Sequence, residues 1–337
     1  MLDGDERQIA ELVEINLASL PRQPLPVRRC QHPKHHGCVS AVFRVRDGLP
    51  PQLRTGVFAE PRSFDALVRF SNGRAFDDRV ADAHGMAIKL LGVTGRGEIG
   101  GHQVPRVQDF VLVDSETFFT GEPKDYARVN HAILGTGWSR ICAWAGLVVR
   151  PWLLLRLRRF VSSQPRSPLE QAYYSTVPFR LGAAVVKYAV LPREVGEAPA
   201  LSGIDGLAEA LRSRLARGEV TFDFLIDIQT DDKRQPVDDP SVSWSRSGAE
   251  RVPVAELTLS RQRVDPTAPL AENLQFSPWH CLPEHKPLGY INRARLPVYR
   301  TLGEARHAAN GVTPLDSAGA PDTFSLPLPG SPGARTA

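Results

Sequence analysis

Paired cysteines, runs of like charge and long uninterrupted apolar segments are all scarce in this sequence. Its four cysteines form no CxxC pair and no zinc-like spacing, which argues against a disulfide framework and a structural metal. Lysine and arginine are scattered, so the formal net charge of +4 does not indicate a nucleic-acid partner. Residues 1–20 lack the basic and apolar regions of a signal peptide. We therefore expect a cytoplasmic protein, and a homodimer is the expected assembly for a chain of 337 residues.

The most apolar part of the chain, ICAWAGLVVRPWLLLRLRRFV, is too short to cross a membrane. Arg150 and Pro151 divide it, and neither part reaches the roughly 20 apolar residues that a bilayer-spanning helix needs. Three arginines lie near its end, at positions 156, 158 and 159. Two interpretations stay open: a helix pair packed on the sheet, or an interfacial helix that contacts lipid and admits lipid-like substrates.

Alternating apolar and polar residues predict a sheet of antiparallel strands. The pattern is clearest over residues 220–230, where Val220, Phe222 and Phe224 share one face. Shorter segments of the same kind lie at 41–45, 66–71, 86–91, 110–113, 185–190 and 255–259. Helical patterns occur at the N-terminus and at 136–163, 206–217 and 292–309, so few of them could connect parallel strands. The predicted class is α+β, an antiparallel β-barrel with surrounding helices.

The composition changes near the C-terminal end of the sequence. From Pro314 onward the chain is rich in proline, glycine, serine and alanine, and it has no apolar periodicity that could support a packed element. We therefore expect one domain over residues 1–313 and a disordered tail over residues 314–337.

Three residues near the end of the predicted domain share one helical face. Arg295, Tyr299 and Arg306 stand at i, i+4 and i+11. A tyrosine binds ferric iron as the phenolate, and a guanidinium one turn away favours that form. Pro297 fits this helix only if it lies in the first turn. Taken alone, the RxxxY pattern occurs by chance in many helices and favours a surface Arg–Tyr pair.

The segment around this tyrosine resembles a known family. RLPVYRTLGEAR is similar to the RxxxY…R segment of catalases, in which the tyrosine is the axial ligand of the haem iron. RRCQHPKHHGCVSAVFRV resembles the catalase stretch before the first barrel strand, which implies His32 as the distal acid–base residue and Arg29 as a propionate partner. The resemblance is scattered over roughly residues 26–310 in the family's order, and it does not include the helical C-terminal region of full catalases.

The next segment, DALVRFSNG, matches the catalase RFS motif. Alternation places Arg69 and Ser71 on one face and Val68 and Phe70 on the other. The resemblance implies that Arg69 binds a propionate, and Ser71 is placed to bond the ring of His32 and fix its tautomer.

One position departs from the family pattern. DFVLVDSETFF aligns with the segment that carries a distal asparagine before a Phe-Phe pair, and this chain has Asp114 there, followed by Phe118 and Phe119. An ionised carboxylate accepts hydrogen bonds and donates none, so the departure predicts weak dismutation of hydrogen peroxide. Alternatively, Asp114 is protonated by burial, orients a substrate, or acts as a second acid–base group beside His32.

The resemblance implies a haem b (iron) enzyme that cleaves the O–O bond of a peroxide, with organic or fatty-acid hydroperoxides as the expected substrates. Heterolysis would give peroxidase chemistry, and homolysis would give hydroperoxide isomerase or lyase chemistry. A weak hydrogen peroxide catalase and a non-catalytic haem sensor or carrier are the alternatives. The expected catalytic residues are His32, Ser71 and Asp114, and the expected haem-binding residues are Arg29, Arg69, Phe119, Arg295, Tyr299 and Arg306, with Tyr299 as the metal ligand.

Overall fold

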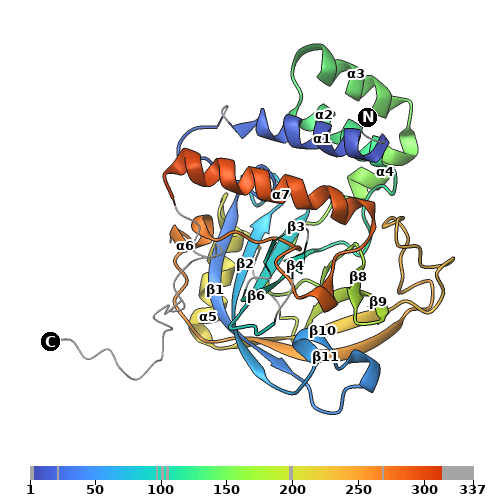
Figure 1. The fold of residues 1–337 in the computed structure, drawn as a ribbon. Helices are drawn as coiled ribbons and strands as arrows, with labels where there is room; N and C mark the ends of the chain where they lie inside the picture. The colour runs from blue at the N-terminus through green and yellow to red at the C-terminus, as the bar shows by residue number, and fades with distance from the viewer. Residues whose placement is uncertain are drawn as a thin grey trace.

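Antiparallel strands dominate the structure, a computed structural model that describes residues 4–20, 23–95, 98–99, 102–103, 106–196, 200–267 and 269–312. The main strands are β1 (His35–Val45), β2 (Ser63–Asn72), β3 (His84–Leu91), β6 (Val107–Val113), β7 (Tyr173–Tyr174), β8 (Phe179–Leu181), β9 (Ala184–Pro192), β10 (Val220–Ile228) and β11 (Glu250–Leu259). Eight of these described strands close into a barrel in the order β10-β11-β1-β2-β3-β6-β7-β9, because β9 also pairs with β10 (Figure 1). β8 extends the sheet beyond β9, and β4 (Glu98–Ile99) and β5 (His102–Gln103) form a separate pair. The predicted α+β class with an antiparallel barrel is confirmed.

Helices surround the barrel. They are α1 (Gly4–Leu17), α2 (Pro123–Leu134), α3 (Gly137–Val148), α4 (Pro151–Phe160), α5 (Gly206–Arg217), α6 (Pro269–Asn273) and α7 (Gly289–Asn310), with short 3₁₀ turns at Pro51–Leu53, Gly56–Phe58 and Pro283–His285. Helix α7 runs along one side of the barrel and α1 lies on it, while α2, α3 and α4 form a lobe that projects away from the barrel (Figure 1). Helix α5 packs against β1.

The barrel interior is filled by large aromatic side chains. Phe43 stacks on Phe110, with ring centroids 6.1 Å apart, and meets Phe224 edge-on at 5.1 Å. The two-residue repeat of the strands places these rings inside, and it buries Val68 and Phe70 in the same core. Arg69 and Ser71 therefore face outward, as the alternation of β2 predicts.

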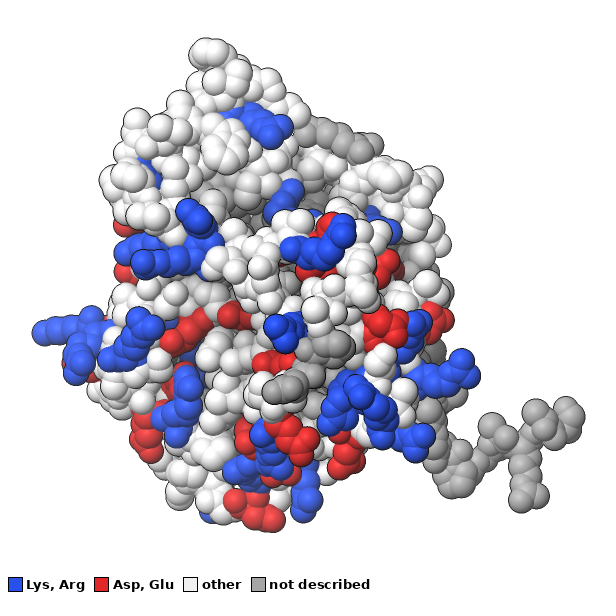
Figure 2. Space-filling view, turned by 180° about the vertical axis from the view of Figure 1, so that it is seen from behind, with Lys and Arg blue, Asp and Glu red and all other residues white. Residues whose placement is uncertain are grey.

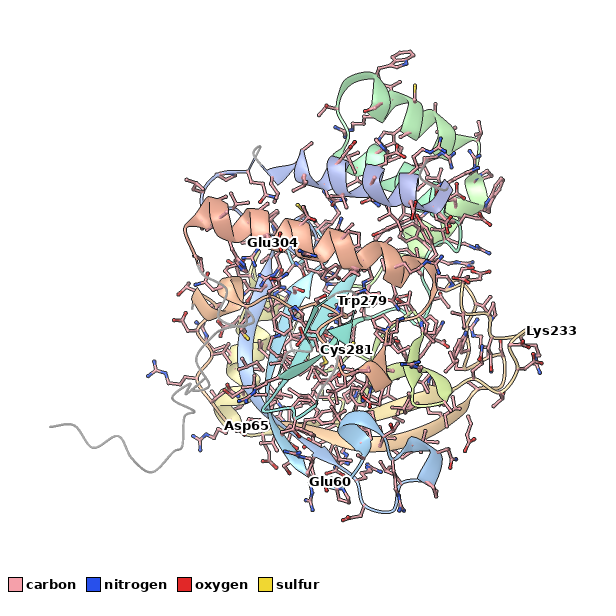
Figure 3. All side chains as sticks on the ribbon, viewed as in Figure 1. Glu60, Asp65, Lys233, Trp279, Cys281 and Glu304 are labelled. Atoms are coloured by element: carbon pink, nitrogen blue, oxygen red, sulfur yellow. The ribbon has the colours of Figure 1, made fainter. Side chains whose placement is uncertain are left out.

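Residues before α7 are fixed to the outer face of the barrel. The buried carboxylate of Asp109 accepts hydrogen bonds from Lys89 Nζ at 2.8 Å and from the main-chain N–H of Ser277 at 2.9 Å. The indole of Trp279, which lies below α7 in Figure 3, donates to the main-chain oxygen of Asn292 at 2.8 Å. These contacts set the position of α7 over the barrel.

The far end of α7 is tied to the N-terminal part of the chain. Asn310 Oδ1 accepts a hydrogen bond from the main-chain N–H of Val27 at 2.8 Å, and Asn310 Nδ2 donates to the carbonyl of Val27 at 2.8 Å. The loop before β1 and the end of α7 are thus held together by one amide side chain.

The strands and helices predicted from the sequence are present in the structure, but α2, α6 and the short strands β4, β5, β7 and β8 were not predicted. The expectation that Pro297 lies in a first helical turn is wrong. Gly289, with φ +81°, allows the turn into α7, and the main-chain N–H of Tyr290 is capped by Asp238 Oδ1 at 2.8 Å. The helix therefore begins eight residues before Pro297, which lies inside it.

Two further expectations concern the C-terminal tail and the apolar segment at 136–163. The disordered tail expected over residues 314–337 lies outside the described residues. In the part of the chain that the structure describes, no helix is long and apolar enough to span a bilayer. The apolar segment predicted at 136–163 forms α3 and α4, and α3 packs on α2 and on α4, so the main packing of this helix pair is on α2 and not on the sheet.

We predict that Phe43→Ala lowers the free energy of unfolding by about 3–5 kcal/mol, because it removes a fully buried ring from the aromatic cluster. Urea denaturation at pH 7 measures this change. Val42→Ala on the same strand is the control, since Val42 is 37% exposed, and we expect a clearly smaller loss. Equal losses in the two variants would contradict the placement of Phe43 in the core.

Candidate active site

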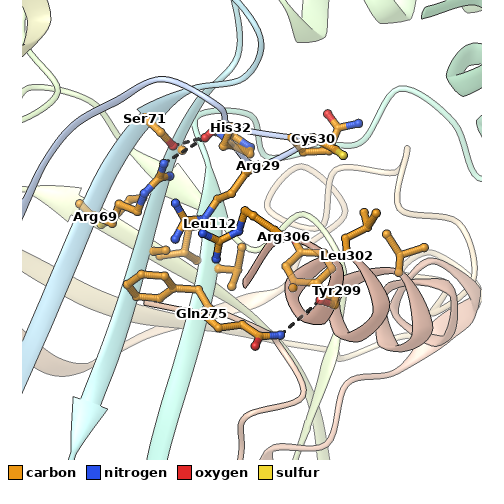
Figure 4. A pocket seen from close by; sticks show the side chains of 18 of the residues that line it. Arg29, Cys30, His32, Arg69, Ser71, Leu112, Gln275, Tyr299, Leu302 and Arg306 are labelled. Atoms are coloured by element: carbon orange, nitrogen blue, oxygen red, sulfur yellow. Dashed lines mark hydrogen bonds between the residues drawn. The ribbon is translucent and has the colours of Figure 1, made fainter. Parts of the chain in front are cut away.

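A cavity lies between the outer face of the barrel and α7 (Figure 4). Strands β2, β3 and β6 supply one wall, and α7 and the segment before it supply another. Much of this lining is apolar and comes from Met86, Ala87, Val111, Leu112, Val298 and Leu302. His32 and Tyr299, which the sequence places far apart, both line it.

His32 is held in place through its main chain and its ring. It has a left-handed conformation with φ +56°, its N–H donates to Gly73 O at 2.9 Å, and Arg69 Nη2 donates to its carbonyl at 3.0 Å. The ring Nδ1 shares a hydrogen bond with Ser71 Oγ at 3.1 Å. This bond leaves Nε2 as the nitrogen that a molecule in the cavity would meet.

Gly85 on β3 makes room for this imidazole. A Cβ atom at position 85 would lie 2.7 Å from both Cε1 and Nδ1 of the His32 ring, closer than real carbon contacts allow. The ring therefore packs directly against the strand backbone. A side chain at position 85 would force it away from Ser71.

The imidazole of His32 is uncharged at neutral pH. Burial, and secondly the charge of Arg69, lower its pKa from 6.5 to about 4. The charges of Asp82 and Asp114 oppose this shift without reversing it. A neutral ring can accept a proton, which is the property that a general base requires.

Tyr299 extends from α7 beside Arg295, one turn earlier. Arg295 Nη2 donates to Tyr299 Oη at 3.1 Å, and the guanidinium carbon lies 5.2 Å from the centre of the tyrosine ring. Arg295 also donates to Asn292 Oδ1 at 3.3 Å, and Asn292 is fully buried and bonded to Pro178 O. The guanidinium is thereby fixed next to the phenol oxygen, where it would stabilise a phenolate.

Three arginines that the sequence assigns to anion binding converge on the same cavity. Arg29 pairs with Glu272 at 3.1 Å, Arg69 approaches the same carboxylate at 3.8 Å, and Arg306 donates to the main-chain oxygen of Glu272. Arg69 is buried, and burial, followed by the charge of Arg29, lowers its pKa well below the usual value. This part of the cavity is strongly cationic.

Three of the predicted site residues, Asp114, Phe119 and Arg295, do not line the cavity, and of these Arg295 reaches the site through its hydrogen bond to Tyr299. Asp114 binds His84 instead: one carboxylate oxygen lies 3.0 Å from Nδ1 and the other accepts from the main-chain N–H at 2.8 Å. Phe119 packs on Phe118, with ring centroids 4.2 Å apart, and on Phe160 in the helical lobe. The acid–base role of Asp114 and the haem contact of Phe119 stay predictions, and the geometry places both residues outside the lining.

Several residues of the site were not identified from the sequence. Glu272 lies on the short helix α6 and Gln275 follows it, in a part of the sequence without clear periodicity, and Gln275 Nε2 donates to the main-chain oxygen of Tyr299 at 3.2 Å. Gly85 stands in a strand pattern, where an isolated glycine is a signal of close approach by another group. Cys30 also lines the cavity. Among the described residues, no three His, Cys, Asp or Glu side chains cluster so as to hold a metal ion.

We predict that the ring of His32 titrates with a midpoint near pH 4. The unfolded chain has the ordinary value of 6.5 and takes up its proton first, so wild-type stability should fall relative to His32→Gln as the pH drops from about 6.5 towards 4. Proton NMR of the histidine rings, assigned with that variant, measures the midpoint. A midpoint near 6.5, or a constant stability difference over this range, would contradict the burial described above.

Solved structures of other proteins share this architecture. No family model matches the chain, and no curated protein matches it. A bacterial catalase structure superimposes with a TM-score of 0.67 at 18% sequence identity, covering 92% of this chain and 64% of its own. A fungal catalase matches with a TM-score of 0.65 at 19% identity, covering 89% of this chain and 64% of its own.

Catalase A from Saccharomyces cerevisiae gives the same result, with a TM-score of 0.65 at 18% identity and coverage of 89% of this chain and 66% of that one. The chain thus spans about two thirds of the length of these catalases. The closed antiparallel barrel with helices around it is the architecture that they share. The chain therefore has the fold of these catalases.

Proposed function

We propose that this protein is a haem-dependent oxidoreductase that acts on peroxides, with organic or fatty-acid hydroperoxides as its substrates. The observation that carries the proposal is that His32 and Tyr299 line one cavity although they lie near opposite ends of the described chain. A proton acceptor and a phenol beside a fixed guanidinium are the two groups that haem peroxide chemistry needs on its two sides.

The residues around the cavity fit a haem. The apolar walls of the cavity suit a macrocycle. The cationic end suits two propionates, which Arg29, Arg69 and Arg306 would hold. Tyr299 would hold the iron through its phenolic oxygen, as the tyrosine does in tyrosine-ligated catalases.

Each residue of the site then has a defined role. His32, uncharged at neutral pH, accepts the proton of the hydroperoxide and returns it to the departing oxygen. Ser71 holds the imidazole through Nδ1, and Arg295 stabilises the phenolate of Tyr299. The haem, when bound, supplies the redox chemistry that breaks the O–O bond. Asp114 acts on His32 through its charge, from its position beside His84.

A second hollow next to the cavity supports a bulky substrate. It shares Arg29 and Cys30 with the cavity and is also lined by Leu25, Phe76 and Leu134. Two further arginines, at positions 28 and 74, stand at the same hollow. Apolar side chains together with guanidinium groups suit a long-chain carboxylate better than they suit hydrogen peroxide.

The bond between His32 and Ser71 favours an enzyme over a haem carrier. A carrier needs no oriented proton acceptor above its haem, whereas here the imidazole is fixed by a side chain and two main-chain contacts.

We predict that the protein purified after expression with ample haem has a ferric high-spin absorption spectrum, and that Tyr299→Phe alters or abolishes it, because phenylalanine has no oxygen to bind iron. Tyr290→Phe is the matched control: Tyr290 also lies on α7, beside Arg293 at 5.7 Å, but does not line the cavity. A colourless wild type, or equal spectra for wild type and Tyr299→Phe, would refute the proposed ligation.

We also predict that the loaded enzyme consumes a fatty-acid hydroperoxide with a higher kcat/KM than hydrogen peroxide, and that His32→Gln lowers this constant by about 10²–10⁴-fold, the usual contribution of an acid–base group. A panel of hydroperoxides and an oxygen electrode measure both reactions. Vigorous oxygen evolution from hydrogen peroxide alone would identify a catalase instead. A spectrum that no peroxide changes would identify a haem carrier.

A further inference from the structure

Helix α3 exposes its more apolar face to solvent. Trp138, Ile141 and Val148 lie on one side of the helix and are 75%, 56% and 67% exposed. The opposite side buries only Ala143 and Leu147, against the rest of the helical lobe. In a water-soluble helix the larger apolar side chains face the core, so this exposed stripe indicates a surface with a partner.

Helix α4 continues this surface and adds positive charge. Trp152 and Leu155 are 56% and 58% exposed, one turn apart, and Arg158 and Arg159 are exposed at the end of the same helix. Arg140 is exposed on α3. Arg140, Arg158 and Arg159 form no ion pair with any of the described residues, since their side chains make none of the salt bridges found there.

Acidic residues are missing from this part of the chain. Between Asp125 and Glu170 the sequence contains seven arginines and no aspartate or glutamate. The uppermost part of the molecule in Figure 2 accordingly shows blue atoms among white ones and no red. The exposed lobe therefore combines tryptophan and aliphatic side chains with unbalanced cations.

We propose that α3 and α4 bind the surface of an anionic lipid bilayer. Tryptophan favours the boundary between lipid headgroups and acyl chains, and an apolar helix face with flanking arginines is typical of helices that lie in that boundary. Ile141 and Val148 insert among the upper acyl chains, and Arg140, Arg158 and Arg159 contact the lipid phosphates. No membrane-spanning segment is required.

A second copy of the chain fits this face less well. In a symmetric dimer the same patch of both copies meets, so the arginines of one lobe would lie near those of the other without carboxylates from α3 or α4 to neutralise them. Like charges brought together in this way oppose association. Anionic lipid phosphates supply the missing negative charge.

The lobe is connected to the proposed substrate route. Leu134, the last residue of α2, lines the hollow beside the haem cavity, and α3 begins three residues later at Gly137. Binding to a bilayer would thus bring the opening of the site close to acyl chains. Lipid binding by α3 and α4 does not require haem, and vesicle flotation measures it without an assay of peroxide turnover.

We predict that the full chain floats with vesicles of phosphatidylcholine containing 30% phosphatidylglycerol at low salt, but not with vesicles of phosphatidylcholine alone. Ile141→Glu/Val148→Glu should weaken binding by more than about tenfold, because two inserted aliphatic side chains are replaced by carboxylates. Arg158→Glu/Arg159→Glu should weaken it by at least about fivefold per arginine, which corresponds to about 1 kcal/mol each near an anionic surface.

Matched surface variants control for changes in fold or overall charge. Val80→Glu/Val195→Glu replaces valines that are 53% and 72% exposed outside the lobe, and Arg44→Glu/Arg263→Glu reverses two exposed arginines elsewhere. Both should bind like the wild type, and all variants should keep the wild-type melting temperature.

Three results would overturn the proposal. The first is failure of the wild type to bind anionic vesicles at low salt. The second is an equal loss of binding in the control variants. The third is a dimer in size-exclusion chromatography that Ile141→Glu/Val148→Glu converts to a monomer while the wild type ignores vesicles, which would assign the face to contact between copies of this chain.

Discussion

The two-residue repeat of β2, β3 and β6 is the constraint on which the site depends. One set of side chains, including Phe70, Ile88 and Phe110, fills the barrel, and the alternate set points outward to α7. Without a packed interior the strands would not hold their register, and Arg69 and Ser71 would not meet His32. The stability of the barrel and the geometry of the cavity are therefore two consequences of the same pattern.

The cavity has two regions that differ in charge. Around His32, burial keeps the imidazole uncharged, and the nearby guanidinium of Arg69 acts in the same direction. Around Glu272, three arginines concentrate positive charge at one end of the cavity. A bound anion would relieve the mutual repulsion of these arginines, so ligand binding and the stability of this region should be coupled.

Sequence reasoning succeeded where the determining pattern was local. Alternation within β2 is enough to separate Arg69 from Val68, and helical spacing is enough to bring Arg295 to Tyr299. It failed where a distant residue decides the outcome. Asp238, far from α7 in sequence, caps that helix and moves its start away from Pro297.

The same reason explains the residues that were misplaced or missed. Asp114 follows the last residue of β6, where alternation no longer specifies a direction, and its partner His84 lies on a neighbouring strand. Phe119 joins a lobe built on α2, a helix that the sequence did not reveal. Glu272 gains its role only when Arg29 and Arg69 have been brought to it by the fold.

The hydrogen bonds between the side-chain amide of Asn310 and the main chain of Val27 join two parts of the chain that the ribosome makes at very different times. The N-terminal wall of the cavity is synthesised first and stays without its counterpart until the last turn of α7 has been translated, so the cavity closes only after α7 has left the ribosome.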